Sequence, residues 1–182
     1  DPKHKTGYLF MTTKQGTVKK TKLEDYNNIR TSGLIAIKID EGDDLKWIRV
    51  TTGDDEVVIS TSLGQAIRFH ENDVRPMGRT ARGVRGVRLK AGDVVVGMDI
   101  VQESSSIFVI SEKGYGKRTK IAQFSPHKRG GVGIRSAVVN TKTGNLISVK
   151  SLTDETPEVI IISTAGQTIR LGLKDIPQLG RT

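Results

Sequence analysis

The chain has 182 residues, and its 29 Lys and Arg against 20 Asp and Glu give a formal net charge of +9. It contains no Cys, so a disulfide framework, a thiol nucleophile and a Cys-ligated zinc site are excluded. No apolar run approaches the roughly 20 residues that a membrane-spanning helix needs. The surplus of positive charge is compatible with a polyanionic partner but does not identify one.

The composition predicts an all-β protein. Ile, Val and Thr together number 53, whereas Leu and Ala number 18, and β-branched residues favour strands. Short apolar runs are bounded by Gly, Asn, Asp and Ser, and no long helical period is present. In chain order, the expected strands are Tyr8–Thr13, Leu34–Ile39, Val57–Thr61, Val94–Val101, Ile107–Ser111, Leu146–Val149 and Val159–Thr164.

A strand followed by a glycine turn recurs four times. The turn glycines are Gly16, Gly64, Gly114 and Gly166, which are 48, 50 and 52 residues apart. Each predicts a β-hairpin, because Gly adopts the positive φ that tight turns require. A basic residue stands four positions after each glycine, and these four residues are Lys20, Arg68, Arg118 and Arg170.

A second Gly-rich element follows the hairpin in each of the first three repeats, clearest at 82–88 and 129–135 and weaker at 32–38. A period of about 50 residues with about four strands is typical of a propeller-like array with one blade per repeat. We expect an incomplete disc of four-stranded blades formed by one domain over residues 1–182. Its repeats are about 7–52, 53–103, 104–154 and an incomplete 155–182.

Charge follows the phase of the repeat. Residues 14–38, 64–90 and 113–135 contain 20 basic and 4 acidic residues, for a net charge of +16, and the remaining residues carry −7. In a blade array equal phase means equal position, so the basic blocks are predicted to form one continuous band. Such a band suits duplex DNA, which basic side chains bind through phosphates without reading bases.

Gly brings the main chain close to phosphate, and Arg presents a planar fork to its oxygens. An alternative interpretation is that the charges only keep sheet edges soluble, and RNA is a further alternative partner. The expected DNA contacts are Lys19, Lys20, Arg68, Arg79, Arg82, Arg85, Arg88, Lys117, Arg118, Arg129, Arg135 and Arg170.

Three strings resemble the C-terminal domain of the bacterial DNA gyrase A subunit, namely Gly16–Thr21, Val74–Arg88 and Gly114–Thr119. The closing Gln178–Thr182 also resembles the start of that family's final basic segment. The second family that the repeats resemble is a close relative, the C-terminal domain of the topoisomerase IV A subunit. The resemblance implies a β-pinwheel, a propeller-like disc of about six blades with a basic perimeter that wraps DNA.

The family's signature box reads Gln-basic-Arg-Gly-Gly-basic-Gly, and its nearest match is His127–Gly133. Lys128, Arg129, Gly130, Gly131 and Gly133 fit the box, whereas His127 and Val132 depart from it. Arg129 is already among the expected DNA contacts, and the resemblance adds the other four positions to them. The departures leave open whether the segment is a functional box or an ordinary blade loop.

The resemblance implies a non-catalytic domain that supports negative supercoiling by a type II topoisomerase. The resemblance implies three partners, which are double-stranded DNA, the gyrase B subunit and the N-terminal part of the same A subunit. It also implies a location in the bacterial cytoplasm, in association with the nucleoid. We expect no cofactor, metal, membrane or small-molecule substrate, since the three histidines lack metal-ligand spacing. The alternative function is a propeller-like protein-interaction module whose basic band binds an acidic partner.

Overall fold

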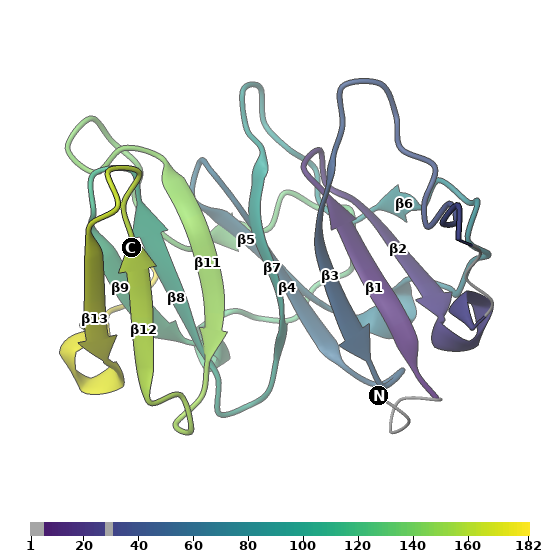
Figure 1. Ribbon diagram of the computed structural model, residues 1–182. Helices are drawn as coiled ribbons and strands as arrows, with labels where there is room; N and C mark the ends of the chain where they lie inside the picture. Colours follow the sequence, from purple (N-terminus) through teal and green to yellow (C-terminus); the bar gives the residue numbers. More distant parts are fainter. Residues whose placement is uncertain (1–5, 28–30) are drawn as a thin grey trace.

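The computed structural model describes residues 6–27 and 31–182, and within these residues all regular elements are strands and short 3-10 helices. The predicted all-β class is therefore confirmed. The strands form four antiparallel sheets that follow one another across the molecule (Figure 1). We number the hairpins and the strands that continue them as blades 1 to 4, in chain order.

The first two sheets have four strands each. The strand order in the first is β3 (Leu45–Thr51), β1 (Tyr8–Thr13), β2 (Thr17–Lys22), β6 (Val84–Arg85). In the second it is β10 (Ile134–Arg135), β5 (Gln65–His70), β4 (Glu56–Thr61), β7 (Val95–Val101). The other two sheets are smaller than the four-stranded blades that the sequence predicts.

The third sheet has three strands, in the order β11 (Leu146–Leu152), β8 (Ser106–Ser111), β9 (Gly116–Lys120), and the fourth is the hairpin of β12 (Glu158–Ile162) and β13 (Thr168–Gly172). Each hairpin leads into a single 3-10 turn. These turns are η2 (Leu23–Tyr26), η3 (Glu71–Asp73), η4 (Ile121–Gln123) and η5 (Leu173–Asp175).

The four predicted hairpins are present, and their registers are equivalent. Their turn glycines have φ values between 79° and 83°, in the left-handed region that Gly tolerates. In each hairpin the basic residue that follows the glycine pairs with an apolar residue of the first strand. The pairs are Phe10 with Lys20, Val58 with Arg68, Phe108 with Arg118, and Ile160 with Arg170.

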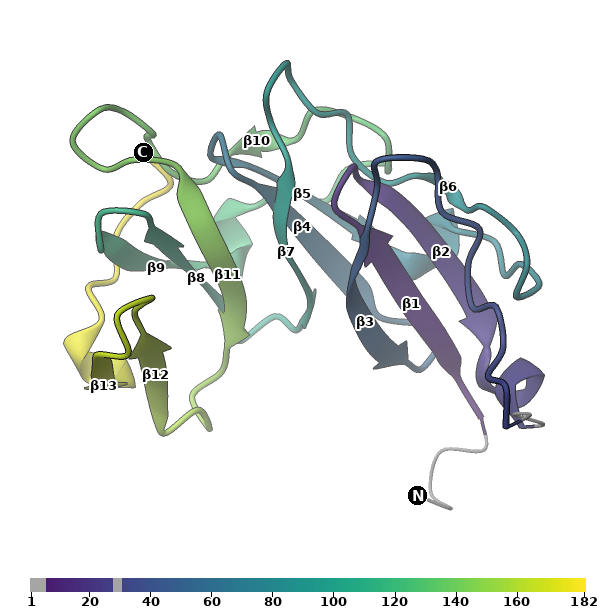
Figure 2. The same ribbon diagram turned by 45° about the horizontal axis from the view of Figure 1, so that its top comes forward.

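In each four-stranded sheet, the edge strand that pairs with the second strand of the hairpin comes from the following repeat. Strand β6 lies in the second repeat but pairs with β2 of blade 1, and β10 lies in the third repeat but pairs with β5 of blade 2 (Figure 2). Pairing thus links each blade to the next through the main chain as well as through side chains.

The predicted strand over Leu34–Ile39 is wrong, because this segment is irregular. It lies 50 residues before Val84–Leu89 in the repeat, and no strand among residues 6–27 and 31–182 pairs with it. A short segment becomes a strand only when a neighbour accepts its hydrogen bonds. Its Ile37 is nevertheless buried, and Lys38 N donates a hydrogen bond to Ala81 O at 3.2 Å.

Hydrophobic clusters lie between successive blades. Phe10 and Val18 of blade 1 pack with Val57, Ile59 and Met98 of blade 2 in the first cluster. The second cluster joins blade 2 to blade 3, and the third joins blade 3 to blade 4. Blades 2 and 3 therefore each bury one face against the preceding blade and the other against the following blade.

No helix in the described part of the chain is long and apolar enough to cross a membrane.

Candidate nucleic-acid interface

In the first three hairpins the basic residue contacts the next blade rather than lying free on the rim. The Lys20 side chain is 2% exposed, and its ammonium group lies 3.3 Å from the carboxylate of Glu71, which is fully buried. It also donates a hydrogen bond to Asn72 Oδ1 at 3.0 Å and lies over the Tyr8 ring. Because Glu71 and Asn72 belong to η3, Lys20 of blade 1 clamps blade 2.

Arg68 and Arg118 form the same kind of clamp one and two blades further along. Arg68 is ion-paired with Glu56 of its own blade and donates to the carbonyls of Ile121 and Phe124, at 3.3 and 3.1 Å, around η4 of blade 3. Arg118 Nε donates to Ile176 O at 3.1 Å, just after η5 of blade 4. The basic residue four positions after the turn glycine therefore joins each of the first three blades to the next.

Lys19 is also buried. Its ammonium group donates to the carbonyls of Ala36, at 2.7 Å, and Arg79. Burial lowers the pKa of Lys19 from 10.5 to about 8, against the attraction of nearby Asp25. Since Lys19 and Lys20 are almost inaccessible, we leave both, with Arg68 and Arg118, out of the interface proposed below.

The Gly-rich elements form a continuous strip, which we call the outer ribbon, from residues 33–40, 79–90, 127–138 and 178–182. Backbone hydrogen bonds join the first three pieces in succession, and the Arg181 side chain joins the fourth piece to the third. Lys38 N donates to Ala81 O, Arg88 N donates to Gly131 O at 2.8 Å, and Gly130 N donates to Gly86 O at 2.6 Å. The ribbon contains the outermost strands β6 and β10, so it follows the outer edge of the blades (Figure 2).

The ribbon carries most of the exposed cations of the predicted set. Arg85, Arg88 and Arg135 are exposed, and their guanidinium groups make no hydrogen bond or ion pair with any described residue. Arg82 and Lys128 are exposed but ion-paired, with Asp40 and Asp73 respectively. The half-buried Arg79 lies on the ribbon as well.

Arg129 and Arg181 attach the ribbon to itself. Arg129 donates to the carbonyls of Asp73, at 2.8 Å, and Arg85, at 3.0 Å, and Arg181 donates to the carbonyl of Arg135 at 3.2 Å. The predicted set missed Arg181. The likeness of Gln178–Thr182 to Pro76–Thr80 was the signal that would have identified it, because Arg181 occupies the place of Arg79.

The glycines of the partial signature box have structural roles. The Gly130 N–H is used within the ribbon. A Cβ atom at Gly133, where φ is +77°, would lie 2.3 Å from Ala66 O of β5, so only Gly fits there. Gly131 is exposed, and its carbonyl accepts the hydrogen bond from Arg88.

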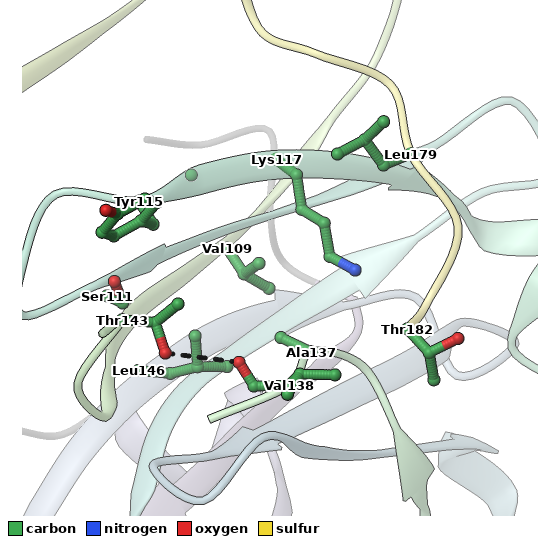
Figure 3. A pocket seen from close by; sticks show the side chains of 11 residues that line it. Val109, Ser111, Tyr115, Lys117, Ala137, Val138, Thr143, Leu146, Leu179 and Thr182 are labelled. Carbon is green, nitrogen blue, oxygen red and sulfur yellow. Dashed lines mark hydrogen bonds between the residues drawn. The ribbon is translucent and has the colours of Figure 1, made fainter. Parts of the chain in front are cut away.

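A cavity of about 260 Å³ lies beside the third hairpin, where Lys117 points between Leu179 and Thr182 on one side and Val138 on the other (Figure 3). The equivalent places at the first two hairpins are filled. Gly16 O accepts N–H groups of Gly86 and Val87, and Gly64 O accepts those of Ser136 and Ala137. Burial lowers the pKa of Lys117, which is half-buried.

Arg170 differs from the three clamp residues. Among the residues that the structure describes, its exposed guanidinium pairs with Glu158 of its own hairpin alone, at 2.6 Å, and this pairing lowers the pKa of Glu158. No group of three or more potential metal ligands occurs in residues 6–27 and 31–182.

The architecture defines a propeller-like repeat protein with a basic strip at its outer edge. A family model described as DNA gyrase C-terminal domain, beta-propeller matches residues 7–52, 55–102, 105–152 and 157–182. The chain therefore belongs to this family.

Relatives and solved structures agree. The chain is 42% identical over 178 residues to the DNA gyrase A subunit of Chlamydia pneumoniae and 44% identical over 175 residues to that of Ureaplasma parvum. These alignments cover 97% and 96% of the chain but only 21% of each relative, so the chain spans about a fifth of their length.

Two solved structures superpose closely. A DNA gyrase A C-terminal domain matches with a TM-score of 0.87 and 28% identity, over 97% of this chain and 59% of that one. The C-terminal domain of a DNA topoisomerase IV matches with a TM-score of 0.89 and 27% identity, over 97% and 55%.

Proposed function

We propose that the chain is a non-catalytic domain that binds duplex DNA through phosphate contacts along the outer ribbon. The observation that carries the proposal is the position of Arg85, Arg88 and Arg135. These three exposed guanidinium groups have no partner among the described residues, and they lie on a strip that runs across successive blades. Membership of a gyrase family supports the proposal.

The ribbon suits phosphate binding for physical reasons. A planar guanidinium binds phosphate oxygens in a bidentate manner, and its release of condensed counterions favours association. Arg82, Lys128 and Arg170 are exposed and paired with carboxylates, so phosphate competes with Asp40, Asp73 and Glu158 for them. Because phosphates are common to all sequences, binding is expected to be independent of sequence.

The clamps explain how the ribbon stays rigid enough to bend DNA. Duplex DNA has a persistence length of about 150 bp, so a tight bend costs several kcal/mol. Lys20, Arg68 and Arg118 fix each blade to the next, and this holds the cations of successive blades on one arc. Because the arc is already ordered in the free protein, little of the free energy gained from phosphate contacts is lost to ordering it on binding.

We further propose that the bound duplex is wrapped and that the wrap supports negative supercoiling in a gyrase. In that enzyme the B subunit, together with the N-terminal part of the A subunit, would carry out ATP hydrolysis and DNA cleavage. The relatives, which are gyrase A subunits, support this assignment. Its location would be the bacterial cytoplasm, in association with the nucleoid.

The salt dependence of DNA affinity tests the interface. Affinity for a random-sequence duplex is measured by fluorescence anisotropy over a range of KCl concentrations, for the wild type and for Arg85→Gln/Arg88→Gln/Arg135→Gln. If each Arg neutralises one phosphate, the slope of log K against log salt becomes shallower by about 2.7.

A control removes the same charge away from the ribbon, by Lys46→Gln/Lys150→Gln/Lys174→Gln on β3, β11 and η5. All three lysines are exposed. This variant should keep the wild-type slope. Equal slope changes in the two triple variants would overturn the assignment of the ribbon, and absence of binding at low salt would overturn DNA binding altogether.

A further inference from the structure

Lys19 of β2 holds two pieces of the outer ribbon. Its side chain is buried, and its ammonium group donates one hydrogen bond to Ala36 O, at 2.7 Å, and another to Arg79 O. Ala36 lies in the ribbon piece 33–40, and Arg79 is the first residue of the piece 79–90. A single side chain in the body of blade 1 therefore fixes both pieces from the side that faces away from solvent.

The second of these pieces is attached to blade 1 at two points. Arg79 is held by Lys19, and Arg85 belongs to β6, which pairs with β2. Between these points the ribbon runs close over β2, because a Cβ atom at Gly83 would lie 3.3 Å from the Cβ atom of Lys19. The placement of Arg82, and of the guanidinium groups on either side of it, therefore depends on the Lys19 hydrogen bond as well as on β6.

The equivalent position in the other blades shows that packing does not require a lysine. In blade 2 the residue three positions after the turn glycine is Ile67, which is fully buried. There the ribbon is attached by Arg129, which donates to two main-chain carbonyls. In blade 3 the position is Lys117, whose ammonium group again donates to a ribbon carbonyl, that of Gly180. An ammonium group at Lys19 thus serves the attachment of the ribbon rather than the packing of the blade.

We propose that Lys19 is a positioning residue for DNA binding, whose ammonium group aligns the ribbon cations with the phosphates and makes no phosphate contact itself. This inference rests on the DNA-binding function proposed above. Hydrogen bonds from a charged donor are stronger than those from a neutral one, so the alignment is firmest while Lys19 is protonated. DNA affinity is therefore coupled to the protonation of a side chain that is buried in the free protein.

The charged groups around Lys19 give the direction of this coupling. Burial lowers the pKa of Lys19 to about 8, which Asp25 of η2 opposes and Arg79 of the ribbon reinforces. The Tyr26 hydroxyl of η2 also donates to Ala36 O, at 3.4 Å, and burial raises its pKa, so it stays neutral at pH 8 to 9. Phosphate bound at Arg79 offsets that guanidinium charge and favours protonated Lys19. Affinity should therefore fall as the pH rises above about 8.

The pH dependence of DNA affinity tests the proposal. Affinity for a random-sequence duplex is measured by fluorescence anisotropy from pH 7 to pH 9, at one low salt concentration, for the wild type, Lys19→Met and Lys22→Met. The control Lys22→Met removes an exposed lysine of the same strand that is paired with Glu24. Affinity should fall severalfold over this range for the wild type and the control. Lys19→Met should bind severalfold more weakly than the wild type at pH 7, with little change up to pH 9.

Amide hydrogen exchange gives a second readout that needs no DNA. Lys38 N donates to Ala81 O, at 3.2 Å, between the two ribbon pieces that Lys19 holds. Loosening of these pieces exposes that amide, so it should exchange several times faster in Lys19→Met than in the wild type. The Arg88 amide, which is bonded to the third ribbon piece, is the internal control and should keep its rate.

Three outcomes would overturn the positioning role and leave the DNA-binding proposal intact. They are a wild-type affinity that stays constant between pH 7 and pH 9, a loss of affinity in Lys19→Met that is equal at both ends of this range, and an unchanged exchange rate at Lys38. The first of them does not depend on the folding of any variant. A wild type that fails to bind DNA at pH 7 and low salt would instead overturn the DNA-binding proposal and this inference with it.

Discussion

Replacing Lys20 with Met separates a structural cation from a DNA-binding one. The substitution keeps much of the side-chain volume but leaves the carboxylate of Glu71 buried without its ion pair. Removing one partner of a buried pair costs about 3–5 kcal/mol. Glu71 keeps hydrogen bonds from Thr51 Oγ1, Gly53 N and Asp55 N, at 2.8, 2.8 and 2.9 Å. These bonds continue to support its charge, so we expect a cost near the lower end, about 3 kcal/mol.

The free energy of unfolding is measured by urea titration for Lys20→Met, Glu71→Gln and the double variant. Because the double variant removes the unpaired charge, it should cost less than the sum of the two single variants. Lys20→Met should also keep the wild-type salt slope for DNA, because the native side chain is not accessible to phosphate. A cost below about 1 kcal/mol, together with a slope shallower by about one, would refute the clamp and restore Lys20 as a DNA contact.

Three further variants test local features. Because the folded state lowers the pKa of Lys19 to about 8, the unfolded chain holds that proton to higher pH, so stability should rise between pH 8 and 10.5. Lys19→Met should flatten this rise by up to about 3 kcal/mol in urea titrations, and an unchanged rise would contradict its burial. Gly133→Ala places a Cβ atom against Ala66 O and should lower the free energy of unfolding by more than about 3 kcal/mol. The control Gly92→Ala, at φ +74° in open space, should lower it by about 1 kcal/mol. Equal urea midpoints for the two variants would contradict the contact at Gly133. The Asp99 carboxylate accepts hydrogen bonds from Arg49 of blade 1 and from Ser151 N of blade 3. Asp99→Asn replaces this carboxylate with an amide and should lower the urea midpoint by the equivalent of about 1–3 kcal/mol. An unchanged midpoint would contradict this bridging role.

The hairpins were predictable because their signals are local. A turn glycine, an apolar run before it and a fixed offset to a basic residue determine each hairpin within about 15 residues of sequence, and all four are present. The strand over Leu34–Ile39 was predicted wrongly for the converse reason. Its apolar composition is that of a strand, but strand formation depends on a partner that is remote in sequence.

The position of the basic residues in the repeat did not predict where their side chains point. Phase shows that Lys20, Arg68 and Arg118 occupy equivalent positions, but it does not show whether that position faces solvent or the next blade. Their acceptors, such as Glu71 and the carbonyl of Phe124, lie about 50 residues away and become visible only when the blades are packed. For Arg85, Arg88 and Arg135 the expectation of exposure agrees with the structure.

Constraint of DNA writhe tests the central claim most directly. The protein is incubated with closed circular DNA and a type I topoisomerase, and the distribution of linking numbers is read by gel electrophoresis after the protein is removed. We predict a shift that grows with protein concentration and is lost in Arg85→Gln/Arg88→Gln/Arg135→Gln but kept in Lys46→Gln/Lys150→Gln/Lys174→Gln. A wild type that binds the circles and leaves their linking number unchanged would contradict wrapping along the outer ribbon.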